Sequence, residues 1–505
     1  MRFGIDFGTT RTAVAVVDRG NYPVLSVEDT FGDAHEYIPS VVALHDGELV
    51  AGWEAVALGE DNPTLIRSFK RILTREQVTA DTPVRLGDNP RPLGDVLQAF
   101  ASYVLSRVRA HQEALGDTSD VEIVLGVPAN SHSAQRLLTL DAFTRAGATV
   151  LGLVNEPSAA AFEYTHRHPK MLNSRRSSVI VYDLGGGTFD TTLVRIEGTE
   201  HEVVTSLGIG RLGGDDFDET LADLAVTESG RDNDAFGRRA RRRLVDEARS
   251  AKENLVPQSR RLILELGEQD VVVPVTAFYD AVTPLVEQTL GALRPLIGRE
   301  AEDLDNALKD TDIAGVYLVG GASALPLVPR LLRERFGRRV HRSPFPAAST
   351  AVGLAIAADP DSDYHLRDRL SRGIGVFRER DAGQAVSFDS LVAPETEPGA
   401  DGSIRVTRRY RAAHNVGWFR FVEYAAIGAA ADHPGDLSLI AELAVPFDPA
   451  LAGVTDLAAI PVERRDDGPE VTETVIVDPD GITAIRIEVA REGDPFVVEA
   501  SVTPR

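Results

Sequence analysis

The sequence predicts a two-lobed α/β domain in its N-terminal part and a smaller all-β domain after it. Two distant segments, Phe3–Val17 and Val179–Ile196, share one pattern of strand, aspartate, glycine turn, threonine and strand. A third segment, Val316–Gly321, is a run of apolar residues that ends in two glycines. Beyond Ser371 the sequence changes to short runs in which polar and apolar residues often alternate, as in strands with one wet face.

The repeated hairpin is the main evidence for two lobes. A unit that occurs twice in one chain marks a duplicated structural element, and we expect its two copies to face each other. Stretches with helical spacing of apolar residues lie between the copies, at 93–114 and 133–146, and again beyond them at 235–255. Strands and helices are therefore mixed along this part of the chain, which predicts the α/β class.

The C-terminal part is predicted to be all-β. A polar stretch with a proline, Asp359–Asp363, marks a boundary between domains. We therefore expect an α/β domain at 1–358, a linker at 359–370 and an all-β domain at 371–505, without a long helix after the strands. The expected strands lie at 404–410, 418–424, 437–445, 471–477, 482–489 and 496–502, with glycine turns between several of them.

The composition excludes several classes of function. The formal net charge is −24, which argues against a nucleic-acid-binding surface and against docking on an anionic membrane, because both need clustered cations. The chain has no cysteine, so disulfides and thiolate chemistry are excluded. No apolar stretch is long enough to span a bilayer, and Met1–Asp6 runs into a strand without a signal region. We therefore expect a cytoplasmic protein.

A basic run, Arg238–Arg243, interrupted by Ala240, lies within the helical stretch at 235–255. Such a run usually forms a solvated helix face. The alternative is a local contact with an anion or a partner.

The two glycine turns have the chemistry of a phosphate site. Consecutive Gly and Thr residues expose backbone N–H groups in a concave nest, and glycine lets the backbone approach a ligand closely. Asp6 and Asp183 would each lie at a strand end beside the phosphates. A bare carboxylate would repel them, so a cation must lie between, and Mg²⁺ suits one or two carboxylates with retained water. The turn residues are Gly8, Thr9, Thr10, Gly185, Gly186, Gly187 and Thr188.

One such turn is a weak signal, because Asp-x-Gly-Thr is usually a plain β-turn. Two copies followed by the strand–Gly–Gly segment are specific, and they resemble the sugar kinase, actin and heat-shock ATPase superfamily, within it the DnaK-type (seventy-kilodalton heat-shock) chaperones. The resemblance covers roughly residues 1–358 and implies an actin-like ATPase domain of duplicated ribonuclease-H-like fold. Further segments that resemble the family's are Ile38–Val42, Phe69–Leu73, Val127–Ala129, Asn155–Ala161, Leu212–Asp218 and Leu318–Gly321.

The resemblance implies a role for each matching residue. Lys70 would reach the γ-phosphate of ATP and stabilise charge in the transition state. Glu156 and Asp190 would position or deprotonate the attacking water, and Thr188 would lie near the γ-phosphate. Hydrated Mg²⁺ would be held by Asp6 and Asp183, and further nucleotide contacts would come from Gly213, Gly214, Lys252, Gly320 and Gly321.

Pro128 and Arg136 resemble the pair that passes the nucleotide state to the next domain in this family. The alternative is an ordinary turn before a helix.

Several departures from the family pattern lie at the nucleoside end. In the family two arginines sandwich the adenine, whereas the matching positions here are Glu253 and Ala324. A ribose-contacting glutamate is matched by Arg249, and Arg11 stands where the family has a small or aromatic residue. ATP and ADP with Mg²⁺ are the expected ligands, and the preference for a base is left open.

The all-β region resembles, more weakly, the family's peptide-binding β-sandwich, through segments at 370–375 and 414–422 and the turn Asp478–Ile482. The sequence shows neither the helical lid nor the apolar linker of the family. We therefore expect a β-sandwich domain without a lid.

Two functions follow from the resemblance. The first is an ATP-binding, ATP-hydrolysing chaperone-like protein for protein folding and stress response, which holds extended polypeptide clients and works with co-chaperones. The second is a nucleotide-gated binding or regulatory module with weak or no hydrolysis. A filament-forming actin relative and a sugar kinase are disfavoured, because the appended β-domain and the Lys70 segment fit the chaperone branch.

Overall fold

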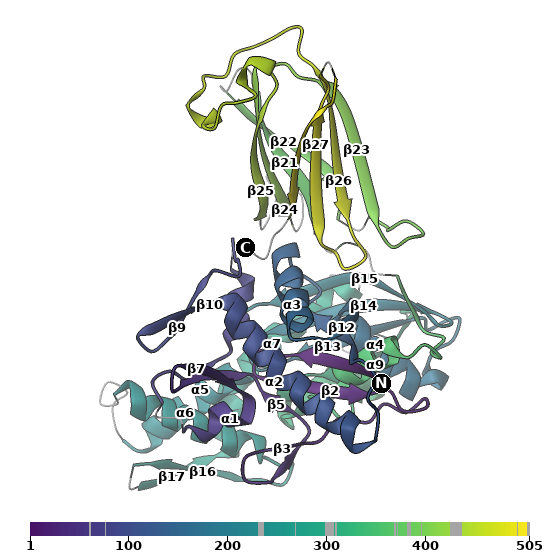
Figure 1. The fold of residues 1–505 in the computed structure, drawn as a ribbon. Helices are drawn as coiled ribbons and strands as arrows, with labels where there is room; N and C mark the ends of the chain where they lie inside the picture. The colour runs from purple at the N-terminus through teal and green to yellow at the C-terminus, as the bar shows by residue number, and fades with distance from the viewer. Residues whose placement is uncertain are drawn as a thin grey trace.

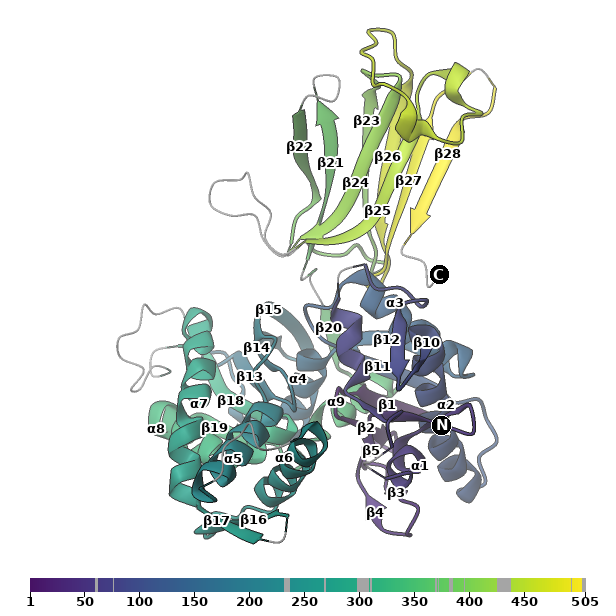
Figure 2. The ribbon, with the colours of Figure 1, turned by 90° about the vertical axis from the view of Figure 1, so that its left-hand side faces the viewer.

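A computed structural model of the chain describes residues 1–501 apart from 60–61, 76, 231–236, 268, 298–307, 309–310, 368–369, 371, 381–384, 395, 425–436 and 492. Two lobes lie side by side, and a body made of strands lies above them (Figure 1). Figure 2 shows the first lobe, in purple and blue, beside the second lobe, in teal. In the part described, no helix is long and apolar enough to cross a membrane.

The first lobe is built on a mixed five-stranded sheet with the order β12-β11-β1-β2-β5. β1 and β2 form an antiparallel hairpin, while β11 and β12 add to β1 in parallel. Helices α2 and α3 pack on the sheet, with Phe3, Phe7 and Phe100 in the shared core. The elements are β1 (Arg2–Phe7), β2 (Arg11–Val16), β5 (Ile38–Pro39), α2 (Leu93–Ala114), β11 (Glu122–Val127), α3 (Ser133–Arg145) and β12 (Thr149–Asn155).

The second lobe repeats this plan in a six-stranded sheet with the order β19-β18-β13-β14-β15-β20. β13 and β14 form the antiparallel hairpin, and β18 and β19 add to β13 in parallel. The mixed α/β class is therefore confirmed, and both predicted hairpins occupy equivalent places. The elements are β13 (Ser178–Leu184), β14 (Phe189–Glu197), β15 (Glu200–Ile209), α7 (Val275–Ile297), β18 (Ile313–Val319), α8 (Leu327–Phe336), β19 (Val340–Arg342) and β20 (His365–Arg367).

Two helices are exchanged between the lobes. Helix α4 (Glu156–Arg167) follows the first sheet along the chain but packs on β13, β14 and β15, whereas α9 (Ser349–Ala358) follows the second sheet and packs on β1, β2 and β11. The helices also pack against each other. Glycines permit this close approach, since a methyl group at Gly353 would lie 1.7 Å from the carbonyl oxygen of Ala159.

Smaller elements complete the two lobes. The first lobe also contains β3 (Val27–Glu28), β4 (Ala34–His35), β6 (Val41–His45), β7 (Glu48–Ala51), α1 (Gly52–Ala57), β8 (Ile66–Arg67), the 3₁₀ helix η1 (Phe69–Thr74), β9 (Pro83–Leu86) and β10 (Asn89–Pro92). The second lobe also contains α5 (Gly214–Glu228), α6 (Arg238–Glu253), β16 (Arg261–Leu266), β17 (Gln269–Pro274) and the 3₁₀ helix η4 (Gly321–Ala324).

The described residues from 372 onward form two four-stranded antiparallel sheets, β22-β21-β24-β25 and β23-β26-β27-β28, with one apolar core between them. Residue 371 and part of the predicted linker, 368–369, lie outside the described residues, so the expected domain limits stay predictions. The strands are β21 (Gly373–Arg380), β22 (Ala385–Val392), β23 (Ile404–Arg411), β24 (Val416–Tyr424), β25 (Leu437–Pro446), β26 (Glu470–Val477), β27 (Thr483–Val489) and β28 (Phe496–Ser501).

A methyl group placed between the exchanged helices should destabilise the protein. We expect Gly353→Ala to lower the free energy of unfolding by about 1–3 kcal/mol, because overpacking forces the backbones of α4 and α9 apart. Gly291→Ala, within α7, is the matched control, because nothing lies within 4 Å of its added methyl group. There alanine should stabilise the helix by about 0.5–1 kcal/mol. Chemical denaturation would measure both, and equal effects would contradict this account of α4 and α9.

Candidate functional site

Two glycine loops from opposite lobes meet between the sheets. One loop, Gly8–Thr10, follows β1, and the other, Gly185–Thr188, follows β13. The second is closed by a hydrogen bond from the Gly185 N–H to the Thr188 carbonyl oxygen at 3.0 Å. The loops touch, since a methyl group at Gly186 would lie 2.3 Å from Thr10 Oγ1. That hydroxyl is buried and has no hydrogen-bond partner in the described part of the chain, so the loops hold an unused polar group.

One lysine lies at the inner end of this cleft. Lys70, on η1, is 4% exposed. Its ammonium group donates to the carbonyl oxygen of Phe7 and to Glu156 Oε1, the latter at 3.1 Å. Glu156 is the first residue of α4. The lysine therefore ties the end of β1 to the start of the exchanged helix.

Three aspartates surround the same space. Asp6 and Asp183 lie near the ends of β1 and β13, and Asp190 near the start of β14, opposite Asp183 in the hairpin register. Burial and then the Glu156 carboxylate raise the pKa of Asp6 and of Asp190 to about 7, although Lys70 opposes the shift. Burial, Glu156 and the other two aspartates raise the pKa of Asp183 well above its ordinary value. Negative charge thus exceeds positive charge here.

This arrangement suits a cation that carries its own water or ligand oxygens. Among the described residues, no three metal-ligating side chains converge on one point. An ion would therefore be held by one or two of the aspartates and completed by other oxygens, as Mg²⁺ commonly is. The buried Thr10 hydroxyl and the loop N–H groups are the complementary donors for phosphate.

Two further glycine segments close around the second loop. The N–H groups of Gly214 and Asp215, at the start of α5, donate to the carbonyl oxygens of Gly185 and Gly186 at 2.9 and 2.6 Å. A methyl group at Gly213 would lie 2.7 Å from Gly186. The predicted residues Gly213 and Gly214 therefore shape the loop through its backbone.

Gly320 and Gly321 lie directly after β18. Gly320 has a φ of +81°, and a methyl group there would lie 2.3 Å from Asp183 Oδ1. Any other residue would thus be strained and would displace the aspartate. Ala324, at the expected base site, ends η4.

The Lys252 side chain is bound by other residues of the same chain. Its ammonium group lies 2.5 Å from Asp218 Oδ1 and donates to the Gly214 carbonyl oxygen at 2.8 Å. Arg249, one turn earlier on α6, pairs with Asp218 at 3.0 Å and Asp215 at 3.2 Å. Both cations therefore fasten α6 to α5 beside the glycine loops.

Two ion pairs span the cleft between the lobes. Arg11 Nη2 lies 2.5 Å from Glu253 Oε2, and its guanidinium stacks over the ring of Tyr37 at 4.3 Å. Arg71 pairs with Asp215 at 2.8 Å. In the sequence, Arg11 and Glu253 were each noted as a departure from the family pattern, but not as a pair. Arg71 was assigned no role. The position of Arg71 next to Lys70 was the available signal.

Known proteins share this sequence pattern. A family sequence model described as Hsp70 protein matches residues 2–368, a span that contains both sheets, both glycine loops and Lys70. The chain belongs to the Hsp70 family. The resemblance stated from the motifs is therefore confirmed, whereas the individual site roles stay predictions.

Curated relatives of this Hsp70-family chain include the chaperone protein HscA of Cronobacter sakazakii, 35% identical over 408 residues. The chaperone protein HscA homolog of Tolumonas auensis is 35% identical over 393 residues, and HscA of Klebsiella pneumoniae is 34% identical over 402 residues. Each comparison covers 74% of this chain and 61% of the relative. The chain thus spans less than two thirds of the length of these relatives.

The C-terminal strands of this Hsp70-family chain contact the first lobe at the start of α3. The Ser133 N–H donates to Glu423 Oε1 at 3.1 Å, and its hydroxyl bonds Glu423 and, at 3.1 Å, Thr483. Arg372 lies 3.8 Å from the same carboxylate. Burial raises the pKa of Glu423, and the Ser133 hydrogen bonds and Arg372 oppose this. A buried carboxylate on β24 therefore caps a helix of the first lobe.

A second contact uses the turn between β26 and β27. Arg136 Nη1 donates to the Asp480 carbonyl oxygen at 3.2 Å, and Nη2 donates to Asn155 Oδ1 at 2.6 Å. Asp480 Oδ1 accepts from the Leu153 N–H at 2.9 Å. Arg136 thus connects this turn to the end of β12, directly before Glu156. Pro128 precedes α3, and the relay role of the Pro128–Arg136 pair stays a prediction.

The metal-free protein should lose stability as the pH rises from about 5 to about 8. Folded Asp6 and Asp190 hold protons up to a pKa of about 7, whereas unfolded aspartates ionise near pH 4. The folded state binds more protons in this window, so the free energy of unfolding falls as the pH rises. Asp6→Asn should reduce that slope by up to about 1.4 kcal/mol per pH unit.

Chemical denaturation in the presence of a chelator at several pH values would measure the slope. Asp88→Asn, at an exposed turn, is the matched control and should leave the slope as in the wild type. A slope that Asp6→Asn does not change would show that Asp6 ionises normally in the folded protein.

Proposed function

We propose that this Hsp70-family chain binds Mg²⁺ and ATP between its lobes and hydrolyses the nucleotide. One observation carries the proposal. Two touching glycine loops enclose a buried hydroxyl that has no hydrogen-bond partner among the described residues, beside four carboxylates and one lysine. A polyphosphate would use the loop donors, and Mg²⁺ would supply the positive charge that the carboxylates lack.

Each residue of the site would have its own role in nucleotide binding and hydrolysis. Asp6 and Asp183 would hold the hydrated ion, because they end the two central strands at the glycine loops. Lys70 would stabilise negative charge on the transferred phosphoryl group, and its ion pair with Glu156 holds it at the cleft. Thr188, within the second loop, would contribute a hydroxyl near the terminal phosphate.

Glu156 and Asp190 are the candidate groups for orienting and deprotonating water. A general base works best when its pKa lies near the working pH, and burial beside Glu156 raises the pKa of Asp190 to about 7. Asp190 is therefore the stronger candidate for accepting the proton, and Glu156 for positioning both Lys70 and the water.

The residues at the nucleoside end of the site favour nucleotide binding with little selectivity for one base. Arg249 and Lys252 are held by Asp218, and Glu253 is held by Arg11. None of these side chains is left pointing at a base without a partner. We propose that the phosphates and metal provide most of the affinity, and that discrimination between bases is weaker than between di- and triphosphates.

We further propose a chaperone-like role in which the β-strand region holds extended polypeptide. The relatives named above are chaperones by name. β22 is an outermost strand with Val386 69% exposed, and an extended peptide can pair with such a strand. The contacts of Asp480 with Arg136 and Leu153 would couple this region to the nucleotide, because Arg136 also bonds Asn155, the residue directly before Glu156.

The alternative, a nucleotide-gated module with negligible hydrolysis, is favoured by the occupied side chains at the nucleoside end. The turnover rate of the wild type separates the two. ATP-specific binding without phosphate release would select the alternative, and both proposals fail if no nucleotide binds in the presence of Mg²⁺.

Removal of the lysine should abolish most turnover and keep binding. We expect Lys70→Ala to lower the rate of ATP hydrolysis by about 10²–10³-fold, because one preorganised charge at a transition state is worth that much. Calorimetry should show retained ATP–Mg²⁺ affinity within a few-fold. Lys170→Ala, at an exposed position of the 3₁₀ helix Pro169–Met171, is the matched control. Wild-type turnover in Lys70→Ala would remove Lys70 from the mechanism.

Loss of the turn contact should uncouple the nucleotide from the β-strand region. We expect ATP to accelerate release of a fluorescent extended peptide from the wild type. Asp480→Ala removes the side-chain hydrogen bond to the Leu153 N–H, which loosens the turn on β12, and should reduce that acceleration by about fivefold or more. Asp466→Ala is the control, since its side chain is 97% exposed. Basal ATP turnover should change little. Unaltered acceleration in Asp480→Ala would mean that coupling runs through another contact.

A further inference from the structure

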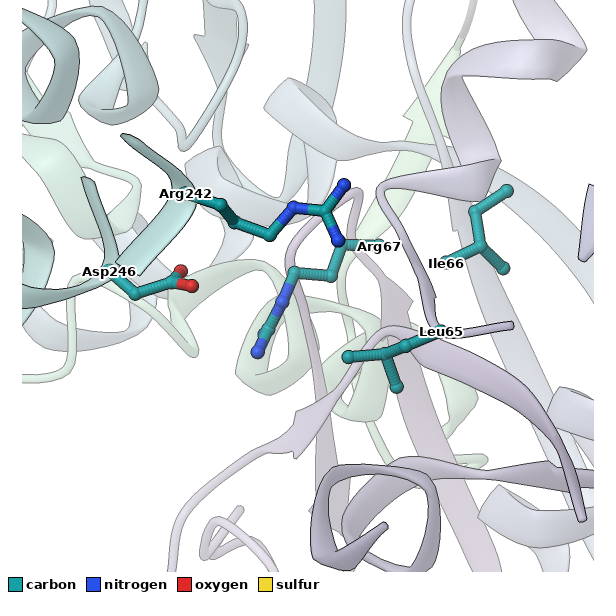
Figure 3. A pocket seen from close by; sticks show the side chains of 5 residues that line it. All are labelled: Leu65, Ile66, Arg67, Arg242 and Asp246. Carbon is teal, nitrogen blue, oxygen red and sulfur yellow. The ribbon is translucent and has the colours of Figure 1, made fainter. Parts of the chain in front are cut away.

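A hollow of about 300 Å³ lies between the two lobes, and none of the residues that line it belongs to the glycine loops. Leu65, Ile66 and Arg67, at β8, line it from the first lobe, and Arg242 and Asp246, on α6, line it from the second. Figure 3 shows the two arginine side chains side by side between the walls. The hollow therefore exists only while β8 and α6 face each other.

The residues that line the hollow carry a net positive charge, although the protein as a whole is acidic. The chain carries a net charge of −24, yet two arginine side chains line this hollow. Arg242 makes no ion pair or hydrogen bond with any residue that the structure describes. It belongs to the basic run Arg238–Arg243, for which the sequence allowed either a solvated face or a local anion contact. Its position opposite Arg67 favours the anion contact, because an anion between like charges relieves their repulsion.

The other lining groups narrow the class of ligand. Asp246 pairs weakly with Arg249 through Oδ1, at 3.7 Å, and its Oδ2 is buried without a hydrogen-bond partner among the described residues. An unused acceptor needs a donor such as a hydroxyl group. Leu65 and Ile66 are half-buried and supply apolar surface for a carbon skeleton. A bare anion would contact the arginines but leave the Asp246 carboxylate and the apolar surface unused.

We propose that this hollow binds a small phosphate monoester with hydroxyl groups, of the sugar phosphate class, and that the ligand holds the two lobes together. The phosphate lies between Arg67 and Arg242, because guanidinium groups bind phosphate oxygens in pairs. The carbon skeleton lies on Leu65 and Ile66, and a hydroxyl group donates to Asp246.

Binding in the hollow would also affect the cleft, because ligand binding and closure of the lobes are linked equilibria. A ligand that contacts both walls binds the closed arrangement better than the open one, so it shifts the population toward closure. Nucleotide would then leave more slowly while the ligand is bound. This second effect rests on the proposed nucleotide site, whereas binding to the hollow does not.

Calorimetric titration of the full chain tests the site directly, with ribose 5-phosphate and inorganic phosphate as separate probes. Ribose 5-phosphate should bind more tightly than inorganic phosphate. Arg242→Ala and Arg67→Ala should each weaken it by about tenfold or more, as expected for a charge-assisted hydrogen bond. Arg243→Ala, which removes the same charge from the next residue of α6, should change affinity less than twofold.

Lys70→Ala separates the hollow from the glycine loops, since it should leave binding of ribose 5-phosphate unchanged. No binding at millimolar concentration, equal binding of both probes, or binding lost in Lys70→Ala but kept in Arg242→Ala would each overturn the proposal. Release of fluorescent ADP should slow with ribose 5-phosphate in the wild type and not in Arg242→Ala. If ADP does not bind at all, the proposed function fails. The calorimetric result still shows whether the hollow binds a sugar phosphate.

Discussion

In the part of the chain that the structure describes, four carboxyl groups share the space between the lobes with one ammonium group. Burial of Asp6, Asp183, Asp190 and Glu156 around Lys70 is unfavourable on its own, because charged groups lose hydration and repel one another. Glycines at the turns keep side chains out of the space. Most of the site follows from this excess of negative charge.

The exchanged helices explain how the carboxylates stay together. Glu156 begins α4, which leaves the first sheet and packs on the second. The residue that pairs with Lys70 thus belongs by sequence to one lobe and by packing to the other. Any rotation of the lobes about the α4–α9 contact changes the position of Glu156 relative to Asp6 and Lys70. The chemistry of the site is therefore tied to the angle between the lobes.

Much of the fold could be predicted because the signals are local. The paired strand–Asp–Gly–Thr segments indicated the duplication, and the glycines marked the turns that the structure places together. The exchange of α4 and α9 could not be predicted, since runs of small residues show that a helix packs closely but not on which sheet. The pattern of β24 likewise gave no sign that Glu423 is buried by contact with α3.

A site residue was predictable where it lies within a recognisable local motif. It was unpredictable where it lies outside the motifs and its partner is remote in sequence. Lys70 and Glu156 were both named, and they form an ion pair. Arg11 and Glu253 are 242 positions apart, and only closure of the lobes joins them. Helical spacing placed Arg249 and Glu253 on one side of α6 but gave no sign that the first turns to Asp218 and the second to Arg11.

The contact of Asp480 with Leu153 has a further effect on the first lobe. β12 is a terminal strand of its sheet, and the N–H group of Leu153 would otherwise face outward without a partner. Open strand edges of this kind are templates for association with other chains. The docked turn therefore shields the first lobe from edge-to-edge aggregation, and a cut between the two regions would expose that edge.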